Sequence, residues 1–173
     1  MIYSVVDIQT GVRMAEGTLP LEVLLPDGGL ARFTMVGETL PGHAPRYRCV
    51  ERVEITTPPE YPHVVASETR EFVEGDDRIT RSYAPDIAAY QRAIEAHVDA
   101  VAQERGYSGA VSIATYVTST NAQWSAEAAA FIAWRDAVWA HVFERLAAVQ
   151  GGQQEPPTLA VFIGSLPPIE WPG

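Results

Sequence analysis

The sequence has little cysteine and little basic charge, and each shortage excludes a class of function. Cys49 is the only cysteine, so no intramolecular disulfide can form and CxxC metal-binding patterns are absent. Lys and Arg number 12 against 22 Asp and Glu, which gives a formal net charge of −10, and no stretch gathers several basic residues. Because a chain this acidic repels a phosphate backbone, we expect no nucleic-acid partner.

Long apolar runs are also missing. No window approaches the roughly 18 uninterrupted apolar residues that a membrane-spanning helix requires, so we expect no membrane partner. The first residues, Met1 to Asp7, lack the basic region that opens a signal peptide. We therefore expect synthesis in a cytoplasm.

Motifs that carry chemistry are equally scarce. The four histidines, His43, His63, His97 and His141, show no HxH or HExxH spacing. No glycine-rich phosphate loop is present either, and Gly106-Tyr107-Ser108-Gly109 lacks the spacing of a nucleophile elbow. The sequence predicts no metal site, no cofactor and no catalytic residue, and we expect a protein that is not an enzyme.

The patterns that are present indicate two kinds of structure, with a change of period near Pro85. Hydrophobic residues make up 47% of the chain, an ordinary value for a protein with a buried core. Before Pro85, six or seven short apolar runs predict a small antiparallel sheet, sandwich or open barrel. We predict an α+β protein with a β-rich domain at residues 1–84. A helical domain with an extended, proline-rich terminal segment follows at residues 85–173.

Within the first part, three segments are informative. Pro26-Asp27-Gly28-Gly29 separates two apolar runs and predicts a tight hairpin, because Asp-Gly supplies positive φ angles. Residues 47–55 alternate and predict a half-buried strand with Tyr47, Cys49, Val53 and Ile55 on its buried side. Glu74-Gly75-Asp76-Asp77 predicts a second hairpin turn.

Within the second part, helix signals begin at Pro85, which we expect at a first helical position, with Asp86 in the first turn. Gly106 ends this helix. The segment 107–121 fits a strand or a short helix, and we favour the helix. Ser125 is the expected N-cap of a long helix that ends near Gly151.

The long helix carries AEAAAFIAWRDAVW at residues 126–139, with an Arg-Asp pair between two tryptophans. On a helical wheel Trp139 lies within a broad apolar stripe and Trp134 near its edge, so we expect Trp139 in the core and Trp134 more open. Arg135 falls near the centre of the stripe, where a guanidinium requires a partner. Either it binds a carboxylate or carbonyl group of another segment, such as Glu170, or the stripe faces a partner chain. Asp136 lies on the other shoulder, so we do not expect it to face Arg135.

Three segments together resemble a family of tailed-bacteriophage tail fibre assembly or tail-associated proteins. They are AIEAHVDAVAQERGYSGAVSIATYVTST, then AEAAAFIAWRDAVW, then PPTLAVFIGSLPPIEWP, and they span Tyr90 to Pro172, about half of the chain. The resemblance implies a phage tail protein that acts by binding other tail or tail fibre proteins, as part of a homo- or hetero-oligomer. It implies no catalytic residue. The location that follows is the virion tail, after synthesis in the host cytoplasm.

Other functions stay open at this point. An assembly chaperone would remain in the host cytoplasm and be absent from the mature virion. A tail-borne hydrolase requires a cleft with convergent ionisable groups. A host-glycan-binding module could use the rings of Tyr47, Tyr61, Tyr83 and Trp124.

The terminal segment supplies further candidates for protein binding. Its apolar residues are spaced by prolines, which lower the entropy lost when such a strip docks. We expect it to lie across the long helix of its own chain, with docking into another chain as the alternative. The candidate partner-binding residues are Trp134, Arg135, Trp139, Leu166, Ile169 and Trp171.

Overall fold

The chain folds into two compact units, which the computed structural model describes over residues 1–40, 46–73 and 76–173. The first unit contains residues 1–58 and 65–84, and the second contains residues 59–64 and 85–173. The short segment 59–64 therefore belongs with the helices that follow Pro85. One of its contacts is the carbonyl of Pro62, which accepts a hydrogen bond from the backbone N–H of Asp86 at 2.9 Å.

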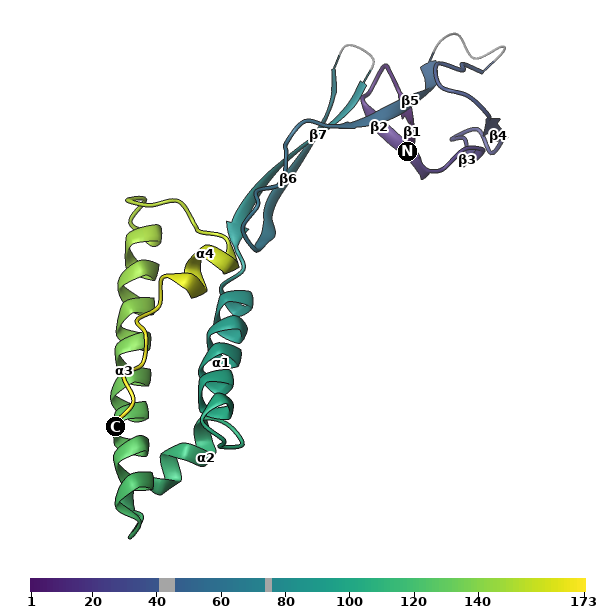
Figure 1. Cartoon of the computed structure of the whole chain (residues 1–173). Coiled ribbons are helices and arrows are strands. Elements are labelled where there is room, and N and C mark those ends of the chain that lie inside the picture. The colour runs from purple at the N-terminus through teal and green to yellow at the C-terminus, as the bar shows by residue number, and fades with distance from the viewer. Residues whose placement is uncertain (41–45, 74–75) are drawn as a thin grey trace. The chain divides into compact units, whose positions relative to one another are not determined.

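Seven strands lie in the described part of the chain (Figure 1). Five form one sheet in the order β2-β1-β5-β7-β6, and β3 and β4 form a separate hairpin. β1 pairs antiparallel with β2 and β5, whereas β5 and β7 pair in parallel. The predicted α+β class is confirmed, with one parallel pairing inside the sheet. The strands are β1 (Tyr3–Asp7), β2 (Val12–Gly17), β3 (Leu21–Leu24), β4 (Leu30–Phe33), β5 (Tyr47–Glu54), β6 (His63–Val73) and β7 (Asp76–Pro85).

The hairpin predicted from Asp-Gly is confirmed as β3 and β4. Gly28 has a φ of 86°, a left-handed conformation that glycine adopts without steric cost. The turn is closed by the N–H of Leu25, which donates to the carbonyl of Gly29 at 2.8 Å. Apolar residues of this hairpin pack with β1 and β5 in one core, which contains Val5, Leu21, Val23, Leu25, Ala31, Phe33, Tyr47 and Cys49.

The buried face predicted for β5 is correct only in its first half. Tyr47 and Cys49 are buried, but Val53 is 38% and Ile55 is 55% exposed. The first half of β5 pairs with β1, over the core, while its last residues pair with β7. The alternation of apolar residues therefore identified one face of the strand correctly, but the core covers only the first part of that face.

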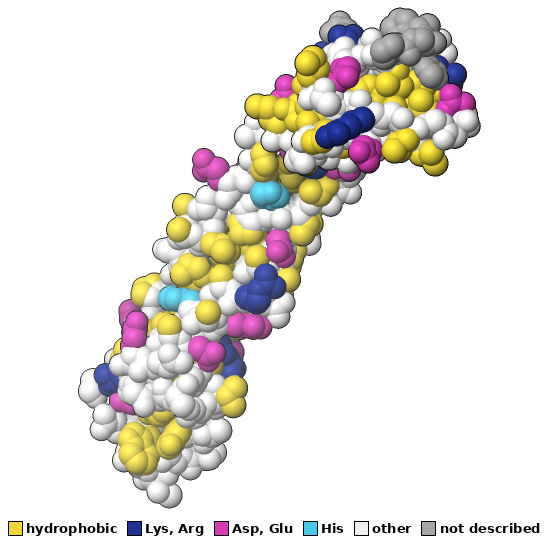
Figure 2. Space-filling view, turned by 90° about the vertical axis from the view of Figure 1, so that its right-hand side faces the viewer, with side chains coloured by type: hydrophobic (Ala, Val, Ile, Leu, Met, Phe, Trp, Pro, Cys, Tyr) yellow, Lys and Arg dark blue, Asp and Glu magenta, His cyan; other side chains and the backbone are white. Residues whose placement is uncertain are grey.

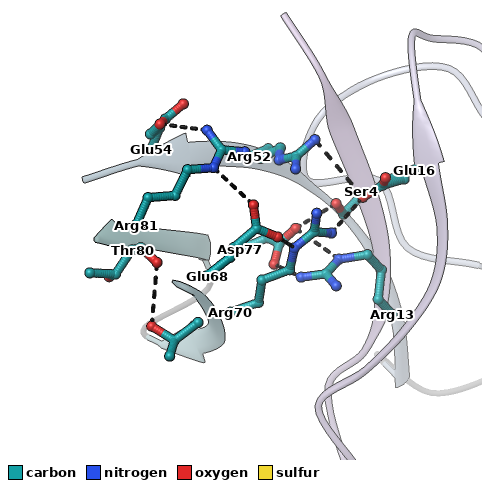
Figure 3. A network of polar contacts seen from close by, with 11 residues as sticks. Ser4, Arg13, Glu16, Arg52, Glu54, Glu68, Arg70, Asp77, Thr80 and Arg81 are labelled. Carbon is teal, nitrogen blue, oxygen red and sulfur yellow. Dashed lines mark hydrogen bonds and ion pairs between the residues drawn. The ribbon is translucent and has the colours of Figure 1, made fainter. Parts of the chain in front are cut away.

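Arginine–carboxylate contacts connect the strands of the sheet (Figure 3). All 12 basic residues of the chain are arginines, whose planar guanidinium binds carboxylates through two N–H groups. Asp77 is 1% exposed and accepts hydrogen bonds from Ser4 on β1 at 2.6 Å and from Arg13 on β2. On the exposed side of the sheet, Arg81 on β7 contacts Glu54 and Glu68 at 2.5 and 2.8 Å.

This network corrects the prediction that Asp76 and Asp77 belong to a turn. Both residues lie in β7, and Asp77 joins three strands. Burial raises the pKa of Asp77, but the hydrogen bonds from Arg13 and Ser4 outweigh it and leave the pKa below its ordinary value. Glu74 and Gly75, the rest of the predicted turn, lie outside the described residues, as does His43.

The second unit is helical. Its elements are α1 (Ile87–Glu104), α2 (Ala110–Ala114), the 3₁₀ helix η2 (Thr115–Thr118), α3 (Ala122–Gln150) and α4 (Leu159–Gly164). The helix favoured for residues 107–121 is confirmed by α2 and η2. One core joins α1, α2, α3 and α4, and Tyr116 of η2 packs against it. The buried residues of this core are Tyr90, Ile94, Val98, Ala102, Ile113, Ala128, Phe131, Trp134, Val138, Val142, Phe162 and Leu166.

The helix ends differ from the predictions at their N-termini. α1 begins after Asp86, whose side chain caps the N–H of Ala89 at 3.0 Å, while Pro85 is the last residue of β7. α3 begins after Asn121, whose side chain accepts from the N–H groups of Gln123 and Trp124, so Ser125 is not the cap. Gly106, with a φ of 94°, directly follows the C-cap of α1, as predicted.

The terminal segment lies along α3 in its own chain (Figure 1, yellow beside green). The indole N–H of Trp134 donates to the carbonyl of Pro167 at 2.7 Å. Trp171 stacks on Phe131 with ring centroids 6.4 Å apart. The intramolecular docking that we expected for this segment is confirmed, because these contacts lie within one unit.

Candidate functional site

An apolar groove opens on the helical unit between α1, α3 and the segment that leads into α4. Its volume is about 150 Å³. Gln91 and Arg145 are the lining residues with an amide or charged side chain, and Tyr90 and Trp139 add one hydroxyl and one indole N–H. The apolar lining residues are Pro85, Ile87, Tyr90, Ile94, Trp139, Val142, Phe143, Leu146, Val149, Pro156, Pro157 and Phe162.

Buried aromatic residues hold one side of the groove in place. The rings of Tyr90 and Phe162 meet edge to face with centroids 5.5 Å apart. The hydroxyl of Tyr90 donates to the carbonyl of Pro157, which fastens α1 to the segment before α4. Burial raises the pKa of Tyr90, so its hydroxyl keeps the proton that this bond needs. The groove is therefore formed before any partner arrives.

The other side of the groove is exposed to solvent. Phe143 is 62% and Ile87 is 47% exposed, although both side chains border an apolar hollow. Trp139 is half-buried and packs against Phe143 with ring centroids 6.1 Å apart. An exposed phenylalanine beside other apolar side chains makes this side of the groove a candidate binding surface.

Acidic residues dominate the charge of the helical unit. It contains ten Asp and Glu residues against four Arg residues. Figure 2 shows one face of the molecule, on which apolar side chains lie among single acidic and basic side chains. A partner that covers the groove gains electrostatic attraction when it carries basic residues around its apolar contact.

A polar site lies at the other end of α1, where Glu127 on α3 is 5% exposed. One oxygen of Glu127 accepts hydrogen bonds from Nε and Nη2 of Arg105 at 3.1 and 2.8 Å, and from the amide of Gln123 at 3.1 Å. Its second oxygen accepts from the hydroxyl of Tyr107 at 2.8 Å. Arg105 also lies over the ring of Trp171, 5.3 Å from its centroid.

These contacts shift the pKa values of Glu127 and Tyr107 in opposite directions. The hydrogen bond from Tyr107, with those from Gln123 and Arg105, lowers the pKa of Glu127. Burial, the hydrogen bond to Glu127 and the charge of Glu127 raise the pKa of Tyr107 to about 12. Glu127 is therefore ionised and Tyr107 neutral at neutral pH, which favours a stabilising contact over proton transfer.

The structure separates the predicted partner-binding residues into two groups. Trp134 and Leu166 are buried within the helical unit, which corrects the expectation that Trp134 presents an open edge. Trp134 is covered because the terminal segment, which the helical wheel does not include, lies over it. Ile169 and Trp171 pack against the same core and are partly buried. Trp139, expected in the core, is the predicted residue that borders the groove.

Arg135 is neither at the centre of a buried face nor bound to Glu170. Its side chain is 35% exposed, and Nη2 contacts the carboxylate of Asp136 at 2.9 Å. The expectation that these neighbours do not face each other was wrong, because the long arginine side chain bends back along the helix. The arginine with a buried carboxylate partner in this unit is Arg105.

Sequence reasoning missed Phe143 and Glu127. Phe143 belongs to the apolar stripe of α3, and nothing in the stripe distinguishes a covered member from an uncovered one. Glu127 is one of several carboxylates, and its partners lie just after α1 and within α3. The sequence signal available for the polar site was the presence of three aromatic residues, Tyr107, Tyr116 and Trp124, near each other in the chain. Whether their rings come into contact depends on the turns around α2.

Within residues 1–40, 46–73 and 76–173, no three His, Cys, Asp or Glu side chains gather in a way that suits a metal ion. The ring of His97 packs against Trp134, with centroids 6.0 Å apart. None of the described helices combines the length and the apolar composition needed to cross a membrane.

Comparisons with protein-family models, with curated proteins and with solved structures found no match.

Proposed function

We propose that this chain is a non-enzymatic, tail- or tail-fibre-associated protein of a tailed bacteriophage, and that it binds another tail protein through the apolar groove. The observation that carries the proposal is the aromatic-lined groove beside the exposed Phe143 on the helical unit. The assignment to a phage tail rests on the resemblance of the segments between Tyr90 and Pro172.

The size of the groove limits the side chain that it accepts. In other proteins an apolar cavity of roughly 150 Å³ takes up a benzene molecule. A groove of about 150 Å³ therefore fits one aromatic side chain or a pair of short aliphatic ones. Because the surrounding unit is acidic, we propose that the occupant is a partner segment with an aromatic anchor flanked by Arg or Lys.

The experiment is site-specific photo-crosslinking in phage-producing cells, with a photoreactive phenylalanine analogue in place of Phe143. The matched control carries the same analogue at Val111 on α2, which is 83% exposed and does not line the groove. We expect a crosslink from position 143 to a tail or tail fibre protein. The crosslinked peptide on the partner should contain an aromatic residue next to basic ones.

Three results would overturn the proposal. The absence of any crosslink from position 143 to a tail protein would show that this residue does not lie at the contact. An equal yield from position 111 would show that the contact does not involve the groove. A crosslink to a second copy of this chain would replace the tail partner with self-association.

A further inference from the structure

A second hollow, separate from the groove, opens where α1 ends and α3 begins. Its volume is about 490 Å³, within the roughly 300–1,000 Å³ of small-molecule sites. Its lining combines aromatic rings with ionic and amide groups, in contrast to the groove. The residues are Glu104, Arg105, Gly106, Tyr107, Tyr116, Gln123, Trp124 and Glu127.

Three aromatic rings along this hollow support one another. Tyr107 and Tyr116 meet edge to face with centroids 5.4 Å apart, and Tyr116 and Trp124 do so at 5.6 Å. Trp124 is nevertheless 47% exposed, although tryptophan is highly buried on average in folded proteins. The contact with Tyr116 restrains the exposed indole, which gives the hollow a firm apolar wall.

The polar groups of the hollow are also restrained, and some keep free hydrogen-bonding capacity. Glu127 binds Nε and Nη2 of Arg105 and the amide nitrogen of Gln123. Among the residues that the structure describes, Nη1 of Arg105, the amide oxygen of Gln123 and the carboxylate of Glu104 make no hydrogen bond with protein. One donor group and two acceptor groups therefore remain for a ligand.

The charges in the hollow disfavour an anionic ligand. Glu104 and Glu127 are opposed by Arg105, and Glu127 is already paired with it. The C-terminal end of α1 contributes partial negative charge, while the N-terminal end of α3 contributes partial positive charge. A polyanion finds no matching field there, and Glu104 is the one charged lining residue without an oppositely charged partner in the lining.

We propose that this hollow binds a neutral carbohydrate of one or two rings, with one sugar face on Trp124. A sugar ring presents C–H groups on one face and hydroxyls around its edge, and each hydroxyl donates and accepts hydrogen bonds. That combination matches an exposed indole beside a guanidinium, an amide oxygen and a carboxylate. Arg105 and Gln123 act as binding residues that Glu127 positions, and the guanidinium of Arg105 also lies over the ring of Trp171.

This inference goes beyond the proposed protein binding and uses different residues. None of the residues that line the hollow also lines the groove. Loss of sugar binding with intact crosslinking at Phe143, or the reverse, therefore tells which of the two proposals fails.

The test is saturation-transfer difference NMR on the full chain, with maltose, cellobiose, lactose and N,N′-diacetylchitobiose as probes. We expect saturation transfer to at least one disaccharide. Trp124→Ala should weaken its binding at least about tenfold, because the stacking face is lost. Gln123→Ala should weaken it less. Phe143→Ala, which removes another exposed aromatic ring, from the groove and not from the hollow, is the matched control and should leave sugar binding unchanged.

Far-ultraviolet circular dichroism confirms that each variant remains folded. If Trp124→Ala unfolds the chain, Trp124→Gln provides the test, since it keeps a long side chain without the aromatic face. The carbohydrate assignment is overturned by the absence of transfer to all four disaccharides, or by unchanged transfer in a folded Trp124 variant. Stronger transfer to choline than to any sugar would also overturn it, because the ligand would then be a cation held by the aromatic rings.

Discussion

Glu127 provides the sharpest test of how the helical unit is held together. Its carboxylate is buried and joins Arg105 and Tyr107, which follow α1, to α3. Glu127→Ala removes this acceptor and leaves the half-buried hydroxyl of Tyr107 without a partner, while Arg105, whose side chain is 37% exposed, regains water. Since hydrogen bonds to a charged group contribute roughly 1.5–3 kcal/mol each, and the arginine contact is partly replaced, we expect a loss of about 2–3 kcal/mol.

Glu127→Gln separates the charge of this residue from its shape. The amide oxygen still accepts from Arg105, and the hydroxyl of Tyr107 can turn to accept from the new NH₂ group. Only the charge assistance is lost, so we expect about 1 kcal/mol of destabilisation at neutral pH. Both variants are compared with the parent chain by urea unfolding, followed through the far-ultraviolet circular dichroism of the helices.

The pH dependence supplies the control. Because hydrogen bonds lower the pKa of Glu127, its contribution is present above the ordinary value of 4.5 and disappears as the pH falls through the folded-state pKa. The difference between the parent chain and Glu127→Gln should therefore shrink below this value. A Glu127→Ala loss within about 0.5 kcal/mol, the range of ordinary surface substitutions, would refute the reasoning.

Other substitutions test the remaining contacts. Phe131→Ala should destabilise the helical unit by about 3–5 kcal/mol in the same urea assay, because the ring is fully buried. Asp77→Asn should weaken the β unit by about 1–3 kcal/mol, measured by thermal unfolding, and the effect should fade in acid because the pKa of Asp77 is lowered. Tyr107→Phe should remove one phenol that ionises near a pKa of about 12 in an ultraviolet absorbance titration. Phe143→Ala should leave stability within about 0.5 kcal/mol while abolishing partner binding in a pull-down.

The local signals in the sequence were strong wherever a short stretch determines its own geometry. Asp27-Gly28 specifies a turn through backbone conformation alone, and Gly106 ends α1 for the same reason. The start of α3 was less certain, because Asn121 and Ser125 lie one turn apart and both are good caps. In the structure Asn121 is the N-cap and accepts hydrogen bonds from two N–H groups of α3, while Ser125 donates to the carbonyl of Val117.

Contacts between distant segments were not predictable in the same way. The helical wheel describes α3 by itself, but the burial of Trp134 depends on Pro167, which lies 33 residues later. Val53 and Ile55 continue an apolar alternation, yet whether a layer covers them depends on the path of other strands. For the same reason the pairing of Arg105 with Glu127 has no sequence signature, although each residue type is ordinary.

The position of the terminal segment determines which apolar side chains remain exposed at the groove and at the polar hollow. Its apolar residues Leu166, Ile169 and Trp171 pack into the core of their own unit, so they do not remain available to a partner. The side chains left uncovered are those the segment does not reach: Phe143 at the groove and Trp124 at the polar hollow. Trp171 also holds Arg105 in position for the second hollow. The terminal segment, which the sequence suggested as a docking surface, therefore completes the core of its own unit, and the two proposed binding surfaces lie at opposite ends of α1.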